Sequence, residues 1–171
     1  MILGLRKSLD DKSPEQQQDK LVKEYGLDDK IATLLTSDFG LQSFYLKALD
    51  DSRATFTQNK APVPSDLAKK VASWLAGEYL SHFNARALDW GEVEVTPAHL
   101  SQLIYLFDQG QITATVAKSI MAEMFETGST PSKIIRDRGY LMQVDSLKLA
   151  EIARSVVDSH PQAVSDFHHG K

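Results

Sequence analysis

The chain has 171 residues, of which 42% are hydrophobic and 25% are charged, and this composition is typical of a folded globular protein rather than a disordered one. No apolar run approaches the roughly 18–20 residues that span a bilayer, so we expect a soluble protein. The absence of cysteine excludes disulfides, thiolate metal ligands and cysteine nucleophiles. The net charge of −4 excludes a strongly basic protein, so any contact with phosphate must be local.

Helix-start signals recur in the first part of the chain. The segment 13–16 (SPEQ) predicts a capping box for a helix that stops at Gly26. Short helices are expected over about 28–35 and, with Ser37 or Asp38 as the cap, up to about residue 50. Residues 51–63 lose the helical period and reach a pair of prolines, which predicts a loop.

A longer helix is expected from Ser65 to about Leu88, because its apolar residues recur at the spacing of a buried helical stripe. Trp74 is expected to be the largest buried anchor of this stripe, with base stacking as the weaker alternative. The buried stripe of this helix consists of Leu67, Val71, Trp74, Leu75 and Tyr79.

Residues 89–95 (DWGEVEV), which follow the helix, contain a glycine and alternating valines, and this pattern predicts an extended link.

The second part of the chain repeats a pattern in which a threonine begins a helix and a glycine ends it. This pattern predicts helices over about 96–110, 113–128 and 130–139. Further amphipathic helices are expected over about 149–156 and 161–167. Together these elements predict an all-α fold, with no strand-rich region and no repeat of fixed period.

The predicted helices divide into two small helical bundles joined by a short extended linker. The first bundle covers residues 13–90 and forms a helical domain. The second covers residues 95–171 and forms a tail domain.

Sequence motifs of common enzymes are missing from this chain. It has no phosphate-binding loop, nucleophile elbow, dinucleotide-binding fingerprint or metalloprotease helix. His160, His168 and His169 could suggest a metal cluster, but adjacent histidines on a helix point to different faces, which favours a polar tail. We therefore expect no catalytic residue, no metal ligand and no cofactor in this chain.

Four basic residues form the local concentration of positive charge outside the long helix: Lys118, Lys133, Arg136 and Arg138. Lys133 and Arg136 are three residues apart and therefore share one face of the predicted helix. Such a group is either a solvated helix face or a set of contacts to phosphate. The sequence pattern leaves both readings open.

Residues 113–128 (TATVAKSIMAEMFETG), followed by 130–139 (TPSKIIRDRG), resemble the tail domain of the B subunit of the tRNA-dependent amidotransferases and of its free-standing relatives. The phrase that carries the resemblance is Ala117-Lys118 with MFETG at 124–128. The resemblance continues into the helical domain that precedes this tail, and downstream, over VASWL at 71–75, EYGL at 24–27, LTSD at 35–38 and PQAV at 161–164.

This resemblance implies a part in converting glutamate or aspartate misacylated on tRNA to glutamine or asparagine, with ammonia released from glutamine. ATP and magnesium would bind in an N-terminal cradle domain that this chain lacks, and the partners would be an amidase subunit and a small C-type subunit. The chain itself would bind the elbow of the tRNA, and this kind of binding recognises the shape and backbone of the RNA more than its sequence. Lys118, Lys133, Arg136 and Arg138 are the expected backbone contacts.

Two departures from the family pattern stand out. Ala114-Thr115 occupies the positions where the family usually shows Gly-Lys, so one phosphate contact is expected to be lost. The family tail is expected to continue past Lys171 into two closing helices, so the tail resembles a truncated one.

Residues 73–74 (SW) and 160–162 (HPQ) look more organellar than bacterial, which suggests the mitochondrial matrix, with the bacterial cytoplasm as the alternative. The alternative function is a helical interaction module that docks on the amidotransferase or a synthetase without binding RNA.

Overall fold

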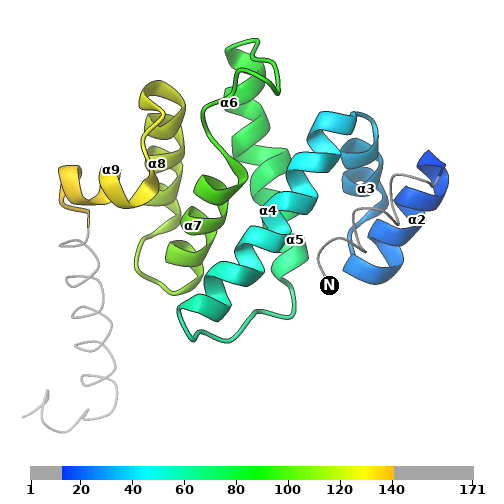
Figure 1. Cartoon of the computed structure of the whole chain (residues 1–171), viewed down its shortest axis with the longest axis horizontal. Coiled ribbons are helices and arrows are strands. Elements are labelled where there is room, and N and C mark those ends of the chain that lie inside the picture. Colours follow the sequence, from blue (N-terminus) through cyan, green and yellow to red (C-terminus); the bar gives the residue numbers. More distant parts are fainter. Residues whose placement is uncertain (1–12, 141–171) are drawn as a thin grey trace, which may run out of the picture.

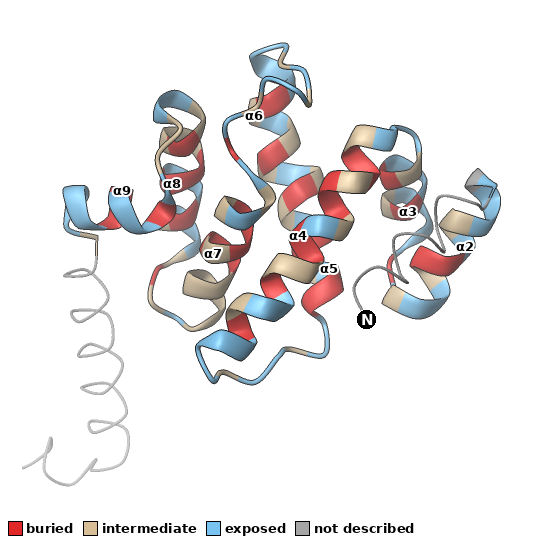
Figure 2. Ribbon diagram, viewed as in Figure 1, coloured by how far each residue is buried: buried red, intermediate tan, exposed pale blue. Residues whose placement is uncertain are grey.

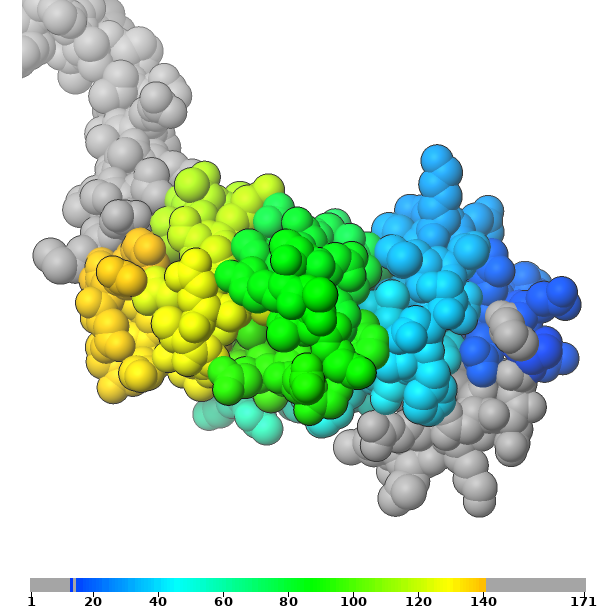
Figure 3. Space-filling view, turned by 90° about the horizontal axis from the view of Figure 1, so that it is seen from above, coloured from blue at the N-terminus to red at the C-terminus, as the bar shows by residue number. Residues whose placement is uncertain are grey.

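The computed structural model describes residues 13–140, and all regular elements in that range are helices, which confirms the all-α fold class (Figure 1). No helix in this part of the chain is long and apolar enough to cross a membrane. The helices predicted over 149–156 and 161–167, and the three histidines near the C-terminus, lie outside the described residues. Helix α2 lies at one end of the described molecule and α9 at the other (Figure 3).

The first and third helices begin at predicted capping residues, Ser13 and Asp38, and the second begins close to its predicted start, with Asp28 as its cap. The Asp28 carboxylate accepts a hydrogen bond from the Ile31 N–H at 2.9 Å, and the Asp38 carboxylate accepts one from the Leu41 N–H at 2.7 Å. Gly26 ends the first helix with φ 66°, as expected for a glycine at that position. These helices are α2 (Pro14–Tyr25), α3 (Asp29–Thr36) and α4 (Phe39–Gln58).

Helix α4 is longer than the sequence predicts. The loop predicted over 51–63 is wrong up to Gln58, because the helix continues to that residue. Ser52 and Phe56 are fully buried, so the apolar face of α4 continues into this segment. The Thr55 hydroxyl donates to the carbonyl one turn earlier at 2.8 Å, which lets this β-branched residue fit the helix.

The predicted long helix is a continuous helical segment with a π-helical turn in its middle. Tyr79 in that turn is fully buried, and its phenol donates a hydrogen bond to the Val95 carbonyl at 2.7 Å. Trp74, expected to be buried, is only half-buried, and its ring meets Phe107 edge-on at a centroid distance of 5.5 Å. The segment consists of α5 (Leu67–Trp74), η1 (Leu75–Tyr79) and α6 (Leu80–Ala85).

Residues 89–95 form a packed turn rather than the predicted extended link. The Asp89 carbonyl accepts hydrogen bonds from two backbone N–H groups three and four residues later. The Trp90 indole stacks on the Phe83 ring at a centroid distance of 4.4 Å. It also occupies the space that a side chain at Gly40 would need, so this turn is fitted closely against the start of α4.

The last three described helices begin and end where the sequence predicts. The side chains of Thr96, Thr113 and Thr130 each accept a hydrogen bond from the N–H three residues later. Gly110, Gly128 and Gly139 follow these helices with φ of 64°, 65° and 67°. The helices are α7 (Pro97–Asp108), α8 (Ala114–Thr127) and α9 (Pro131–Arg138).

Helix α7 packs directly on α4, although the sequence places these helices in different bundles. The Ser101 hydroxyl of α7 is fully buried and lies 2.9 Å from the Ala48 carbonyl of α4. Buried residues occupy α4, α5 and α7 where these helices meet, and residues of both predicted bundles belong to the same hydrophobic core (Figure 2). The arrangement as two bundles is therefore not confirmed, and the limits 13–90 and 95–171 stay predictions.

Gly128 and Gly110 provide a matched pair for testing a close contact. Both have a left-handed φ, but a methyl group at Gly128 would meet the Glu94 carboxylate, whereas one at Gly110 would meet nothing. Gly110→Ala should lower the free energy of unfolding by about 1 kcal/mol, and Gly128→Ala by more. Urea unfolding measures both costs. Adding Glu94→Ala should bring the Gly128→Ala cost down to that of Gly110→Ala, and no such relief would contradict this packing.

His99 makes stability depend on pH. Burial lowers its pKa below the ordinary value, and its Nδ1 lies 3.4 Å from the Thr96 N–H, which only an unprotonated Nδ1 can accept. The unfolded chain therefore binds a proton at His99 more readily than the folded chain does. Neutral His99 makes its full contribution to the free energy of unfolding above about pH 6.5, and this contribution is lost as the pH falls below that value.

When the pH is lowered from about 7.5 to about 5.5, we expect the free energy of unfolding to decrease more for the wild-type chain than for His99→Gln. Glutamine can still accept the Thr96 N–H but does not titrate, so the variant controls for all other ionisable groups. Urea unfolding at the two pH values gives the difference. An equal loss in both proteins would show that His99 does not contribute.

Candidate functional site

The structure places two of the four candidate basic residues, Lys133 and Arg136, on the exposed side of α9. The opposite side of α9 packs against α8 and α7 through buried Ile134 and Ile135. Among the described residues, no carboxylate forms an ion pair with Lys133 or Arg136. Both cations lie on one exposed face of the helix, as their spacing of three residues predicts.

Arg138 lies on the same helix but is held by a carboxylate. Its Nε lies 3.1 Å from both oxygens of Glu123 on α8, and this hydrogen bonding raises the pKa of the guanidinium. The pair joins α9 to α8. A phosphate that binds Arg138 must compete with Glu123.

Lys118 is separated from the basic residues of α9. It precedes Glu123 by five residues on α8, which turns the two side chains roughly 140° apart around the helix. Its Nζ lies 2.5 Å from Oε1 of Glu78 in η1, so Lys118 faces the π-helical turn. The four predicted contacts therefore do not form one patch: Lys133 and Arg136 are together, Arg138 lies beside them in an ion pair, and Lys118 belongs to another surface.

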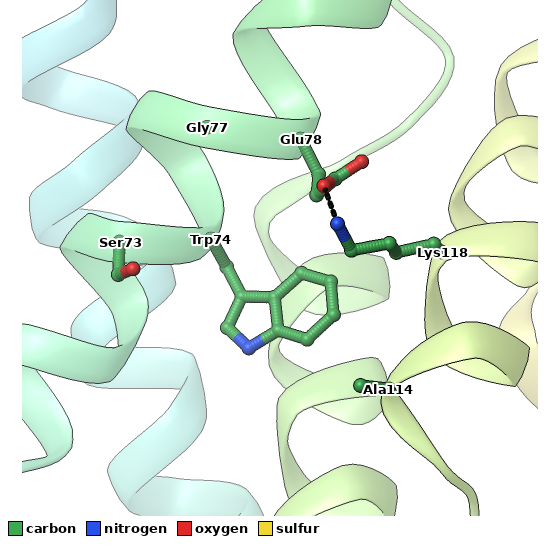
Figure 4. Close-up of a pocket in the computed structure, with 6 residues that line it drawn as sticks. All are labelled: Ser73, Trp74, Gly77, Glu78, Ala114 and Lys118. Atoms are coloured by element: carbon green, nitrogen blue, oxygen red, sulfur yellow. Dashed lines mark ion pairs between the residues drawn. The ribbon is translucent and has the colours of Figure 1, made fainter.

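The Lys118–Glu78 ion pair stands beside a pocket of about 270 Å³ between η1 and α8 (Figure 4). The Trp74 indole extends into this space from the end of α5. Gly77 leaves space on one side, because a Cβ atom there would meet nothing within 4 Å. The pocket is lined by Ser73, Trp74, Gly77, Glu78, Ala114 and Lys118.

Phe125 joins α8 to η1 and α6. Its ring meets Tyr79 edge-on at 4.9 Å and stacks with His82 at 5.4 Å. The guanidinium carbon of Arg86 lies 5.6 Å from the ring centroid, and Arg86 also lies 4.0 Å from the Glu126 carboxylate. Phe125 and Glu126, both part of the phrase MFETG, thus hold helix α6 against α8.

Known proteins are similar to this chain over most of its length. A family model described as "GatB domain" matches residues 56–171, which is more than half of the chain. The chain belongs to this family. The B subunit of the aspartyl/glutamyl-tRNA(Asn/Gln) amidotransferase of Thermoanaerobacter sp. (strain X514) is 31% identical over 167 residues, covering 98% of this chain and 32% of the relative.

The corresponding B subunits of Thermotoga maritima and Brevibacillus brevis give similar results for this GatB-family chain. The former is 31% identical over 158 residues and the latter 32% over 157, and each match covers 92% of this chain and 30% of the relative. The chain thus spans about a third of the length of the curated relatives that it matches. The predicted resemblance to the amidotransferase B subunit is confirmed.

Sequence reasoning found the basic residues of this GatB-family chain but missed the pocket. Trp74 and Glu78 are four residues apart, and this spacing could have indicated that they share a helix face. Lys118 is forty residues away from Glu78, and no periodicity connects them. The pocket walls meet only through the packing of α8 against η1.

The Lys118–Glu78 ion pair should add little stability, because the Lys118 side chain is 57% exposed and solvent screens the interaction. A double-mutant cycle with Lys118→Met and Glu78→Gln should give a coupling energy below about 1 kcal/mol. Urea unfolding of the wild-type chain, the two single variants and the double variant measures this coupling energy. A coupling above about 2 kcal/mol would instead identify the pair as a structural clamp between η1 and α8.

Proposed function

We propose that this chain is the tRNA-positioning part of the B subunit of a glutamine-dependent amidotransferase, acting in the conversion of Glu-tRNA(Gln) or Asp-tRNA(Asn) to Gln-tRNA(Gln) or Asn-tRNA(Asn). The observation that carries the proposal is family membership, with matches to amidotransferase B subunits that cover 92–98% of the chain. Holding the tRNA in the correct orientation contributes to catalysis, and this role needs no reacting group in this part of the protein.

The exposed face of α9 supports this role. Lys133 and Arg136 project from the same side and have no carboxylate partner among the described residues. Two such cations suit the phosphates of an RNA backbone, which fix the position of a complex without reading its sequence. Because the whole chain carries a charge of −4, the proposal requires that this face supply most of the local attraction.

The chemistry of the reaction belongs elsewhere in the proposed complex. ATP and magnesium would bind in the cradle domain of the full subunit, and ammonia would come from an amidase subunit, accompanied by a small C-type subunit. The mitochondrial matrix is the proposed location, with the bacterial cytoplasm as the alternative. This chain would carry the tRNA toward that site and would have no turnover of its own.

A second candidate is an interaction module that docks on the amidotransferase or on a synthetase without touching RNA. The two cross-helix ion pairs favour it, since Glu78 and Glu123 neutralise two of the four candidate phosphate contacts. The acidic net charge points the same way. The two candidates differ in whether tRNA binds and how the affinity depends on salt.

Charge reversal on α9 tests the proposal. We expect Lys133→Glu/Arg136→Glu to weaken binding of tRNA(Gln) and tRNA(Asn) transcripts about tenfold or more, because two phosphate contacts become repulsions. The slope of log affinity against log salt should decrease in magnitude by about 1.4–1.8, at about 0.7–0.9 for each phosphate contact. A gel-shift titration at several salt concentrations measures both quantities.

The matched control is Lys23→Glu/Lys30→Glu, which changes the net charge equally at the α2–α3 end of the molecule. Equal weakening by the two variants would show a general field effect and remove the assignment to α9. A wild-type chain that does not bind tRNA, yet co-purifies with the amidase subunit, would select the interaction module.

A further inference from the structure

We propose that the pocket between η1 and α8 binds a single unstacked guanine base, with Trp74 as the stacking surface and with Glu78 and Lys118 at the hydrogen-bonding edge of the base. The assignment of this base to RNA rests on the proposed tRNA-binding function. The pocket itself is a feature of the described residues and does not depend on that function.

The size of the pocket fits a small planar ligand. Its volume of about 270 Å³ lies just below the roughly 300–1,000 Å³ of sites for drug-sized molecules. The two smallest lining residues, Gly77 and Ala114, leave the space between the helices open. The π-helical turn that contributes Gly77 and Glu78 is a rare structure that often marks a functional site.

Trp74 supplies an aromatic surface that the core does not fully use. Phe107 contacts it edge-on, and the indole is half-buried, in contrast to fully buried Tyr79 and Leu75 on the same helical segment. Its Nε1–H forms no hydrogen bond with a described residue. Bases of single-stranded RNA segments stack on such side chains, and every base has a face that can do so.

The Lys118–Glu78 ion pair places a hydrogen-bond donor next to a hydrogen-bond acceptor, and this arrangement determines which base fits the pocket best. Oε1 of Glu78 lies 2.5 Å from Nζ of Lys118, and within the described range neither side chain has an ion pair or hydrogen bond with another residue. Guanine presents two N–H donors next to its O6 acceptor. The Glu78 carboxylate can accept from both donors while the Lys118 ammonium, held beside Oε1, donates to O6.

The other bases match this pair less well. Adenine presents one donor and no carbonyl oxygen at that edge, and uracil has a single donor between two carbonyls. Cytosine can use one amino group with Glu78 but leaves the second carboxylate oxygen without a partner. We therefore expect guanine to bind best.

The first experiment uses the isolated nucleotide and the 171-residue chain. The chain has two tryptophans, so its NMR spectrum contains two indole N–H signals, and the signal missing from Trp74→Phe identifies Trp74. Guanosine monophosphate should shift the Trp74 signal along a saturable curve, with at least about fivefold weaker effects from adenosine and cytidine monophosphates. Trp90, which packs against Phe83, is the internal reference and should not move.

Ribose 5-phosphate controls for attraction of the phosphate to Lys118. A Trp74 signal that ribose 5-phosphate moves as much as guanosine monophosphate, or that no nucleotide moves, would overturn the proposal. Glu78→Gln should abolish the preference for guanine while retaining stacking on Trp74. If Glu78→Gln keeps the full preference, the assigned edge recognition is wrong.

The second experiment asks whether the base comes from tRNA or from a free nucleotide. Trp74→Leu should weaken tRNA binding at least about fivefold without changing the salt slope, because stacking releases no counterions. Trp74→Phe should restore most of the affinity. Full tRNA affinity in Trp74→Leu, together with a normal response to guanosine monophosphate in the wild-type chain, would leave a site for free nucleotide and overturn the RNA assignment.

The outcome separates this proposal from the proposed function. If the wild-type chain fails to bind tRNA while guanosine monophosphate still shifts Trp74, the tRNA-positioning function fails and the guanine pocket stands. If tRNA binds with the expected salt slope while Trp74 does not respond to the nucleotide, the pocket proposal fails and the function stands.

Discussion

The close contact between α4 and α7 is the constraint on which the rest of the described structure depends. Ala48 and Ser101 are both fully buried and small, which lets the two helix backbones approach each other. The Ser101 hydroxyl lies within hydrogen-bond distance of the Ala48 carbonyl and of a carbonyl in its own helix, so its polar atom is satisfied inside the core. A short distance along the same two helices, Phe56 and Tyr105 meet edge-on at 5.2 Å. This contact joins the segments before and after residues 89–95 in a common core.

The position of the pocket follows from that contact. Helix α7 carries Phe107, which holds the Trp74 ring from one side, and α8 packs on α7 and brings Lys118 toward Glu78. Every wall of the pocket therefore belongs to a helix that the core holds in place. Sites built on helices keep their side chains at more constant positions than sites built on loops. Lys118 and Glu123 lie on different sides of α8, so the pocket and α9 adjoin different faces of this helix.

The charges of this chain show why residue type alone does not identify a phosphate contact. Lys118 and Arg138 are each within reach of a glutamate on another helix, whereas Lys133 and Arg136 have no such partner among the described residues. The pairing residues are 40 and 15 positions away in the sequence. In an acidic chain such pairs are expected to remove many cations from the set that a ligand can use, and only the packed structure shows which cations remain.

The sequence by itself determined the helix class and most helix ends, because these depend on hydrogen bonds within about four residues: threonine and aspartate caps at the start, and glycine with positive φ at the end. The family phrase likewise lies in one continuous segment. The tertiary structure alone decided the extension of α4 through Phe56, the half-burial of Trp74, the packed turn at 89–95 and the Glu78–Lys118 pair. Each of these results from contact between residues distant in the chain. Burial in the core outweighed the weak local preference of the threonine-rich end of α4, and no local pattern records which helices will meet.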